Sequence, residues 1–441
     1  MDDNELLLKM PKDLLMIITS YDHQLIFSLP KNFLMATDWF KLIKNNFSLI
    51  YSKETTTNDD MMKTYIWNCI KDDLNCDIGA GAYHMIIKSN TGTLMSCGEN
   101  RYHQQGCKKY EKQPFFSPVT LPIKNTPVSQ IICGTFHTTI KLPNGILLNV
   151  GYDYNGQLGH EYNNFYGDKH DFRTIKGIPK GPKDISQIVC GNGTTFILLT
   201  NGTLVACGNN TNGQLGCGTT ASYITKFTEI DTVPKNIVEI VCGQYHTIIR
   251  LTDGTLMSTG NNISGQLGHN DFKERKRFEE IKNIPKNIVQ VICGEHHTII
   301  RLTDGTLMGC GNNSSGQLGI QNLDLLFTKF VEIKNIPKNI VEVKSGNNHS
   351  VIRLTDGTLM SCGSNSKGEL GHGDDKYRNT FTKIEDVPKN IIQLICKGMY
   401  TMIRLTDDTI MCCGDNTSGQ FGNGSYDNDS KFKKTFNLNT I

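Results

Sequence analysis

The sequence predicts an all-β protein: a seven-bladed β-propeller of four-stranded antiparallel blades, with a small N-terminal α-helical segment. Three observations lead to this expectation. One glycine-rich segment recurs seven times along the 441 residues, its copies are almost evenly spaced, and short apolar runs of strand length lie between them. A fixed period of about 50 residues is typical of propellers, in which each repeat forms one blade.

The recurring segment starts with a glycine and ends in Gly-Gln-Leu-Gly or a close variant. Successive copies start 53, 57, 52, 51, 52 and 51 residues apart. The first copy is degenerate, because His103 and Gln105 stand where the best copies carry glycine and leucine. The seven copies begin at Gly98, Gly151, Gly208, Gly260, Gly311, Gly363 and Gly414.

Each unit contains runs that predict four strands. In the fifth unit, residues 288–294 and 297–302 are rich in β-branched and apolar side chains. An Asp-Gly pair joins residues 297–302 to residues 306–310, which predicts an antiparallel hairpin. Residues 278–281 of the preceding unit supply a fourth strand after the glycine-rich loop. Glycine suits these loops because it adopts positive φ and lets another chain approach closely.

The C-terminal tail indicates how the ring closes. Residues 436–441 form a spare run of strand type after the last glycine-rich loop, and the first unit begins near Leu74 with no outer strand before it. We therefore expect this run to complete the first blade and join the two ends of the ring.

The N-terminal region does not share the repeat. Residues 10–18 place a proline near a helix start and follow it with apolar side chains, and residues 33–51 carry apolar side chains at helical spacing. We expect a helical segment over 1–54, a polar linker over 55–72 and the propeller over 73–441.

The repeats resemble those of the regulator of chromosome condensation family. The resemblance rests on Cys-Gly-x-x-His-Thr at 242–247 and 293–298, on the Asp-Gly-Thr-Leu turn, and on the Gly-x-Asn-x-x-Gly-Gln-Leu-Gly loop, and it covers roughly 73–441. It implies a seven-bladed propeller. Kelch repeats would place aromatic residues in every blade, but both tryptophans, Trp39 and Trp67, precede the repeats, and WD dipeptides are absent.

The N-terminal segment resembles a degenerate F-box, with a proline, Asp-Leu-Leu, Ile-Ile and a later Trp39. This resemblance implies docking onto a Skp-type adaptor of a ubiquitin ligase. The alternative is a small helical cap packed against the propeller. The composition is also rich in Asn, Ile and Lys, and together with an F-box-like leader it would suit a large DNA virus of a eukaryotic host.

Composition and charge argue against several classes of function. Lys plus Arg is 45 and Asp plus Glu is 43, so the net charge of +2 provides no footprint for nucleic acid. The acidic start does not resemble a secretory signal, and no run approaches the roughly 18 apolar residues of a membrane span. The 15 cysteines include no CxxC pair. We expect reduced thiols in an intracellular protein, cytoplasmic or nuclear.

Cysteine and histidine recur at equivalent positions, which argues for structural roles. A metal site or a catalytic set needs a cluster of different groups, whereas these residues are copies about one repeat apart. We expect the cysteines to pack in the core and the histidines to make hydrogen bonds between blades. The cysteines are Cys133, Cys190, Cys242, Cys293 and Cys396, and Cys97, Cys207, Cys310, Cys362 and Cys413; the histidines are His84, His137, His246, His297 and His349, replaced by Thr194 and Tyr400 in two units.

One repeated lysine is a candidate binding residue. It follows a proline in equivalent loops, which a propeller places on one face, so the lysines predict a partial basic ring that would bind an acidic partner surface. The alternative is a set of solvated lysines in polar loops. The residues are Lys180, Lys235, Lys286, Lys338 and Lys389.

These observations favour a monomeric, non-enzymatic scaffold that binds other proteins through its loop faces, with no cofactor, metal, membrane or specific nucleic acid. Two alternatives remain. The first is a substrate receptor of a ubiquitin ligase, with the F-box-like segment on the adaptor. The second, implied by the family resemblance, is a guanine-nucleotide exchange factor for a Ran-like small GTPase. Two features argue against the exchange-factor alternative. The family resemblance implies a wedge-like insertion that opens the nucleotide site, but only the 57-residue interval carries extra length. The basic chromatin-binding tail that the resemblance implies is also missing from the acidic start.

Overall fold

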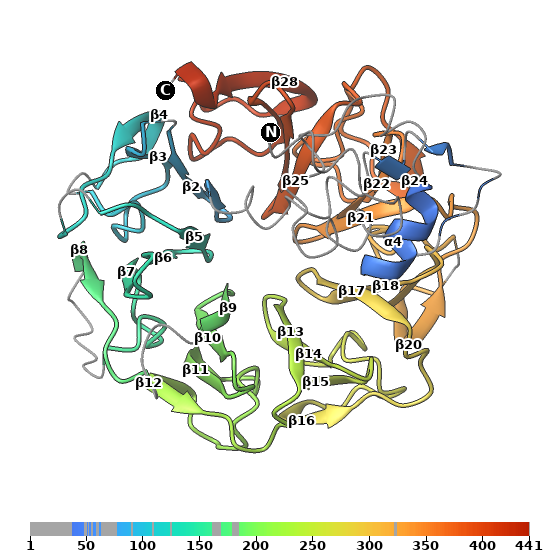
Figure 1. The fold of residues 1–441 in the computed structure, drawn as a ribbon, viewed down its shortest axis with the longest axis horizontal. Helices are drawn as coiled ribbons and strands as arrows, with labels where there is room; N and C mark the ends of the chain where they lie inside the picture. Colours follow the sequence, from blue (N-terminus) through green and yellow to red (C-terminus); the bar gives the residue numbers. More distant parts are fainter. Residues whose placement is uncertain are drawn as a thin grey trace, which may run out of the picture.

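The chain forms a closed ring of seven blades around a central axis (Figure 1). The computed structural model describes residues 38–47, 51, 53, 56–58, 61–62 and 77–440, except 90, 108–109, 124–125, 161–168, 179–184 and 322–323. In this part of the chain each blade is a four-stranded antiparallel sheet whose strands follow sequence order. The first strand of each blade lies nearest the axis and the fourth at the rim (Figure 1). The predicted fold class is confirmed.

The first four blades contain sixteen strands. Blade 1 contains β1 (Ile78–Ala80), β2 (His84–Lys88), β3 (Leu94–Gly98) and β4 (Gln113–Pro118). Blade 2 contains β5 (Gln130–Cys133), β6 (His137–Lys141), β7 (Leu147–Gly151) and β8 (Lys169–Thr174). Blade 3 contains β9 (Ile185–Cys190), β10 (Thr194–Leu199), β11 (Leu204–Asn209) and β12 (Tyr223–Glu229). Blade 4 contains β13 (Ile237–Cys242), β14 (His246–Leu251), β15 (Leu256–Gly260) and β16 (Arg275–Glu280).

The last three blades repeat this order. Blade 5 contains β17 (Ile288–Cys293), β18 (His297–Leu302), β19 (Leu307–Asn312) and β20 (Leu326–Glu332). Blade 6 contains β21 (Ile340–Ser345), β22 (His349–Leu354), β23 (Leu359–Gly363) and β24 (Arg378–Lys383). Blade 7 contains β25 (Ile391–Lys397), β26 (Tyr400–Leu405), β27 (Thr409–Gly414) and β28 (Asp429–Asn437), followed by the short 3-10 helix η3 (Leu438–Thr440).

The Asp-Gly turn forms the predicted hairpin between the second and third strands. In blade 5 the amide of Gly305 donates to the carbonyl of Leu302 at 3.1 Å, and the amide of Thr306 donates to the Asp304 carboxylate at 2.9 Å. Gly305 has φ of +81°, and a Cβ there would lie 1.7 Å from the carbonyl oxygen of Lys338. Glycine is therefore required both by the backbone conformation and by the loop that leads into blade 6.

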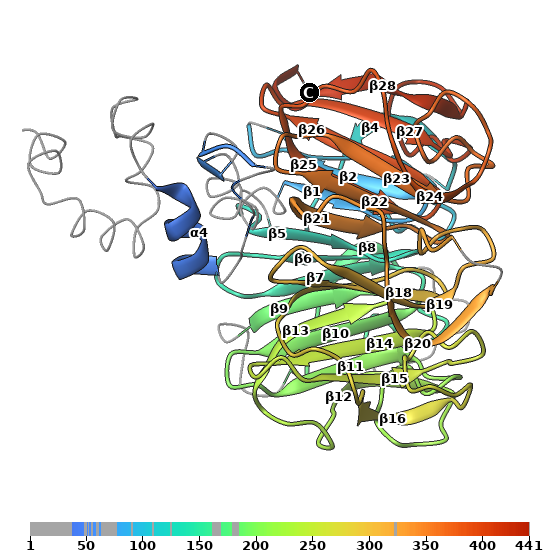
Figure 2. The same ribbon diagram turned by 90° about the vertical axis from the view of Figure 1, so that its right-hand side faces the viewer.

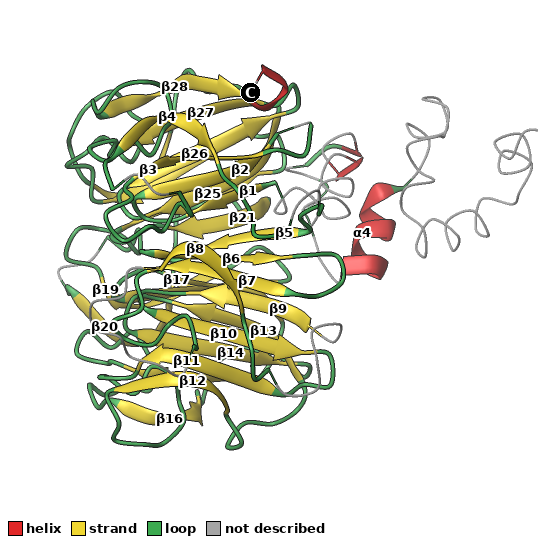
Figure 3. Cartoon of the chain, turned by 90° about the vertical axis from the view of Figure 1, so that its left-hand side faces the viewer, coloured by secondary structure: helices red, strands yellow, loops and turns green. Residues whose placement is uncertain are grey.

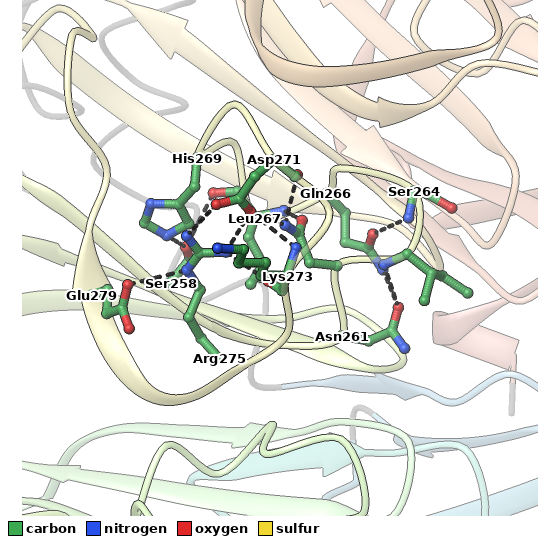
Figure 4. Close-up of polar contacts among 12 residues, drawn as sticks. Ser258, Asn261, Ser264, Gln266, Leu267, His269, Asp271, Lys273, Arg275 and Glu279 are labelled. Atoms are coloured by element: carbon green, nitrogen blue, oxygen red, sulfur yellow. Dashed lines mark hydrogen bonds and ion pairs between the residues drawn. The ribbon is translucent and has the colours of Figure 1, made fainter.

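The glycine-rich loop between the third and fourth strands is held by its own side chains (Figure 4). In blade 4 the Gln266 amide donates to the Asn261 side chain at 2.9 Å and accepts from the backbone amide of Ser264 at 3.0 Å. The backbone amide of Leu267 donates to Asn262 at 3.0 Å. The degenerate first copy keeps this shape because His103 adopts φ of +57°, in the left-handed region that glycine occupies elsewhere.

Neighbouring blades share one hydrophobic contact that repeats around the ring. The second glycine of the loop lies against the ring of a phenylalanine on the outer strand of the next blade; a Cβ added at Gly268 would lie 2.6 Å from Cε2 of Phe330. Core clusters also draw side chains from two adjacent sheets, so burial ties blades together. The seven pairs are Gly106 and Phe172, Gly159 and Phe227, Gly216 and Phe278, Gly268 and Phe330, Gly319 and Phe381, Gly371 and Phe432, and Gly422 and Phe116.

The recurrent histidines make hydrogen bonds between blades, as predicted. His246 of blade 4 lies 2.9 Å from the Thr298 hydroxyl of blade 5, and that hydroxyl donates to the Gln266 carbonyl of blade 4 at 2.8 Å. Because the hydroxyl uses its hydrogen in the bond to the Gln266 carbonyl, its oxygen accepts the hydrogen bond from Nε2–H of the histidine. The same bridge occurs at five junctions, with His84 and Thr138, His137 and Thr195, His246 and Thr298, His297 and Ser350, and His349 and Thr401.

The cysteines before the loop glycine are buried, as predicted, and they add to the same bridge. The Cys310 thiol of blade 5 donates to the Gln266 carbonyl at 3.5 Å, beside the bond from Thr298. Burial raises the pKa of Cys310, so the thiol stays protonated. All cysteines among the described residues are free of disulfides. In the other cysteine series, Cys242 and Cys293 are partly exposed to the central channel.

The prediction that residues 436–441 complete the first blade is wrong. Blade 1 has its own fourth strand, and β28 pairs with β27 of blade 7. Each repeat begins at the inner strand and ends at the outer strand of the same blade, so no strand is left over to complete another blade. The ring closes through side chains and a backbone contact. The rings of Phe116 and Phe436 lie 4.7 Å apart, the Tyr400 hydroxyl donates to the Gly81 carbonyl at 2.9 Å, and the backbone amide of Gly424 donates to the Pro114 carbonyl at 2.7 Å.

The helix α4 (Trp39–Phe47) stands on one face of the ring, above blades 5 and 6 (Figures 1 and 2). Its buried side chains Trp39, Leu42 and Ile43 pack with Met61 against Val341 of β21. Met61 lies within the range expected as a linker, yet it is fully buried. The described helix matches the expectation of a cap packed against the propeller. The apolar stretch 10–18 lies outside the described residues.

We expect Phe116→Ala to lower the free energy of unfolding by about 2–3 kcal/mol, because it empties the contact that closes the ring between blades 1 and 7. Urea denaturation measures this change. Phe115→Ala is the matched control: its ring is 64% exposed, so the loss should stay within about 0.5 kcal/mol. Equal losses in the two variants would contradict this account of ring closure.

Buried histidines should make the protein sensitive to acid. Burial lowers the pKa of His246 to about 3, against about 6.5 in the unfolded chain, so the unfolded state binds the proton first. The contribution of neutral His246 to the free energy of unfolding is therefore fully present above pH 6.5 and is lost as the pH falls toward 3. His246→Thr should reduce the slope of unfolding free energy against pH, between pH 6 and 4.5, by about 1.4 kcal/mol per pH unit.

The control for this prediction is Thr194→Ala, at the equivalent position of blade 3. It removes no titrating group, so it should lower stability at every pH and leave the slope unchanged. Urea denaturation over the pH series gives both quantities, and an unchanged slope in His246→Thr would show that this histidine does not carry the acid sensitivity.

Candidate interaction surfaces

The antiparallel blades give the ring two different faces. The turns between first and second strands and the glycine-rich loops between third and fourth strands share one face, here named the loop face. The hairpin turns between second and third strands and the links between blades share the other, here named the turn face. The helix α4 stands on the turn face, because it packs on Val341, next to the first residue of β21 (Figure 3).

The four described lysines of the predicted basic ring lie on the turn face, and each meets an acidic side chain. Lys235 lies 2.6 Å from Glu229, and Lys338 lies 3.2 Å from Glu332. The other two pair with hairpin-turn aspartates: Lys286 with Asp253 at 3.4 Å, and Lys389 with Asp356 at 2.7 Å. Lys180 lies outside the described residues.

These pairs balance the charge of the lysine ring within the chain. The lysine and carboxylate side chains are about half exposed, so each pair adds little stability. An acidic partner would have to compete with the carboxylate already beside each lysine. Binding of an acidic surface by these lysines stays a prediction.

The helix covers part of the turn face. Val341 of blade 6 is 2% exposed beneath it, whereas Val238 at the same position of blade 4 is 45% exposed. The Tyr51 hydroxyl donates to the carbonyl of Ile340 at 3.4 Å, and burial raises the pKa of this tyrosine. The segment around α4 is therefore fastened to blades 5 and 6 by both apolar and polar contacts.

The loop face carries a continuous strip of aromatic side chains over blades 1 to 3, here named the aromatic strip. It consists of Tyr83, Tyr102, Phe136, Tyr152, Tyr154 and Tyr223. The distance between ring centroids is 5.3 Å from Tyr83 to Phe136, 5.4 Å from Phe136 to Tyr102 and 4.6 Å from Tyr102 to Tyr152. It is 6.1 Å from Tyr152 to Tyr154 and 6.1 Å from Tyr154 to Tyr223. Such spacings are those of favourable aromatic pairs.

The strip is open to solvent. Tyr154 is 46% exposed and Tyr223 is 38% exposed, while the other rings are partly exposed. Burial, followed by the neighbouring phenols, raises the pKa of Tyr152. Burial, followed by the charges of Asp415 and Glu295, raises the pKa of Tyr83. The surface therefore offers apolar ring faces with hydroxyl groups that donate hydrogen bonds.

The strip occupies positions that the repeat leaves variable, and sequence reasoning missed it. Tyr83 and Phe136 directly precede the histidines of blades 1 and 2, and Tyr152 and Tyr154 follow the loop glycine of blade 2. At the same loop positions blades 3 to 6 carry mainly Asn, Ser and Thr. An aromatic excess at variable positions of two neighbouring repeats was the available signal.

The described residues hold no assembled metal site. Among these residues, no three or more His, Cys, Asp or Glu side chains are grouped in a way that could hold a metal ion. No helix in the described ranges has the length and apolar character needed to cross a bilayer.

Comparison with known proteins gives relatives along most of the chain. The ultraviolet-B receptor UVR8 of Arabidopsis thaliana is 27% identical over 356 residues, which cover 79% of this chain and 78% of UVR8. The X-linked retinitis pigmentosa GTPase regulator homolog of Caenorhabditis elegans is 26% identical over 335 residues. That match covers 67% of this chain but only 24% of the relative, so the chain spans about a quarter of its length.

Solved structures share the fold. Human WBSCR16 superposes with a TM-score of 0.66 at 18% identity, covering 74% of this chain and 85% of that one. Prp20p of Saccharomyces cerevisiae superposes with a TM-score of 0.65 at 20% identity, covering 74% and 81%. Family models match as well: the RCC1-like domain over residues 169–439, and the regulator of chromosome condensation (RCC1) repeat over residues 76–104. Since the first of these models spans more than half of the sequence, the chain belongs to the family of RCC1-like domains.

Proposed function

We propose that the chain is a non-catalytic protein-interaction platform and that the aromatic strip of its loop face is the contact surface. The observation that carries this proposal is the strip itself, in which six aromatic rings in contact with one another are partly or largely exposed to solvent on a rigid scaffold. Contiguous exposed apolar surface marks interaction sites, and tyrosine is enriched among the residues that dominate binding energy.

The rigidity of the loop face supports this role. The loops beside the strip are held by side-chain bonds: the Asp153 carboxylate accepts from the backbone amide of Leu158 at 2.9 Å, and the Gln157 side chain accepts from the backbone amide of Asn155 at 3.1 Å. A surface whose loops are already ordered loses little conformational entropy on binding. The strip therefore suits a partner that docks without remodelling the propeller.

A second candidate function is regulation of a small GTPase, including guanine-nucleotide exchange on a Ran-like protein. It is favoured by the relative described as a GTPase regulator homolog and by the shared fold of Prp20p, whose structure was described with its binding to Gsp1p. Two parts of the one long interval, residues 161–168 and 179–184, lie outside the described residues. The exchange-factor hypothesis therefore rests on the relatives.

The ubiquitin-ligase alternative places the adaptor on the N-terminal segment. The relatives include a probable E3 ubiquitin-protein ligase, human HERC6, which is 29% identical over 252 residues that cover 24% of its length. Here Trp39, Leu42 and Ile43 are already buried against the propeller, so an adaptor would have to use other residues of the segment. The segment lies on the turn face and the strip on the loop face, an arrangement that allows two partners at once.

Removing two rings of the strip should abolish capture of the partner. We expect Tyr152→Ala/Tyr154→Ala to weaken binding at least about tenfold, because each exposed tyrosine anchor contributes about 1 kcal/mol or more. The measurement is affinity capture from eukaryotic cell lysate by the full chain, with bound proteins quantified by mass spectrometry. Unchanged melting temperature of the variant shows that the blade is intact.

The matched control is Ile263→Ala, an isolated apolar side chain of the loop face that is 60% exposed. Proteins captured by the parent chain and by this control, but lost from the tyrosine variant, support the strip as the contact surface. Retention of every captured protein by the tyrosine variant would refute it. A Ran-like GTPase among the lost proteins, together with faster release of fluorescent GDP, would establish the exchange-factor alternative instead.

A further inference from the structure

One blade departs from the ring of glycines at the mouth of the central channel. Where the inner strand ends on the loop face, six blades carry glycine and blade 7 carries Lys397. The six glycines are Gly81, Gly134, Gly191, Gly243, Gly294 and Gly346. A charged side chain therefore replaces a hydrogen at a single point of an otherwise uniform ring.

The histidine bridge explains why the five histidine-bearing blades need glycine, and in blade 3 a Cβ at Gly191 would lie 2.5 Å from the Thr194 hydroxyl. A Cβ at Gly134 would lie 2.4 Å from Cε1 of His137, and the same clash recurs with the bridging histidine in the other histidine-bearing blades. Blade 7 has Tyr400 in place of the histidine, and its hydroxyl reaches across to the Gly81 carbonyl. Lys397 pairs directly with Tyr400 in the sheet. The exchange of histidine for tyrosine thus makes room for the lysine.

The mouth of the channel is a small polar cup that is open to solvent on one side and has a volume of about 80 Å³. Its walls are glycine backbone, the thiol-bearing Cys190, Cys242 and Cys293, and the carboxamide residues Asn192, Gln244 and Asn347, with Lys397 as a charged member. None of the described residues that line the cup is acidic. The neutral donors and the single cation give the cup a positive character.

The amine of Lys397 projects into this cup without a counter-ion. Neither a hydrogen bond nor an ion pair joins it to any described residue. Its side chain is accessible to water within the channel, but protein surrounds it, and this desolvation lowers the pKa of the amine. The nearby Lys344 is different, because it pairs with Glu342 at 3.4 Å.

We propose that the loop-face mouth of the channel is a binding site for a small oxyanion group, a carboxylate or a phosphate, with the Lys397 amine as its charged partner. An anion there satisfies the unpaired ammonium and accepts hydrogen bonds from the carboxamides. The site borders the aromatic strip, since Ala82 of the cup directly precedes Tyr83. A molecule docked on the strip can therefore place an acidic group in the cup.

Competitive labelling of the full chain tests the site. Reductive methylation with formaldehyde at pH 8 marks free amines, and peptide mass spectrometry compares Lys397 with the exposed Lys431 in the same sample. Inorganic phosphate, and separately acetate, should slow labelling of Lys397 about threefold at twice their dissociation constants, and chloride at matched ionic strength should not. The two arms show whether phosphate, carboxylate or both are accepted.

The outcome that overturns the proposal is equal labelling of Lys397 in phosphate, acetate and chloride. An amine that formaldehyde cannot reach would also overturn it, since an oxyanion would then have no entry. As a second measurement, the rise in melting temperature produced by phosphate over chloride should disappear in Lys397→Met and persist in Lys431→Met. The variant Lys397→Gly, which restores the glycine of the other six blades, should behave like Lys397→Met.

Discussion

The bridge between neighbouring blades is the interaction on which the rest of the structure depends. A histidine of one blade donates to a hydroxyl of the next, and that hydroxyl donates back to a loop carbonyl of the first blade, as in His246, Thr298 and Gln266. Each group is buried, so leaving any one unpaired would cost about 1–3 kcal/mol. The bridge therefore fixes the distance between neighbouring sheets and also stabilises their packing.

The same bridge explains the composition of the repeat. The imidazole ring needs glycine beside it, the thiol of Cys310 fits the space beside the shared carbonyl, and the glycine of the loop lets Phe330 of the next blade approach. Close packing leaves little freedom at these positions. Residues that face solvent between them differ from repeat to repeat, and both proposed sites lie among them: the aromatic strip in blades 1 to 3, and Lys397 in blade 7, where tyrosine replaces the histidine.

The two faces of the ring are thereby different in kind. The turn face is occupied by the chain itself, through α4 above blades 5 and 6 and through ion pairs at the lysine loops. The loop face leaves Tyr154 and Tyr223 open to solvent. A protein built in this way can hold one partner on its loop face while the N-terminal segment remains on the other side.

The sequence by itself determined the number of blades, the four antiparallel strands of each repeat and the structural role of the histidines and of the cysteines before the loop glycine, because these follow from contacts that most repeats make in the same way. Only the tertiary structure decided how the ends meet, what the lysines face and where the tyrosines gather. Phe436 closes the ring as a side chain and not as a strand of blade 1, Lys389 faces Asp356, and the ring of Tyr102 contacts that of Tyr152 in another blade. These contacts join residues of different repeats or of variable positions, and they exist only once the ring has closed and brought them together.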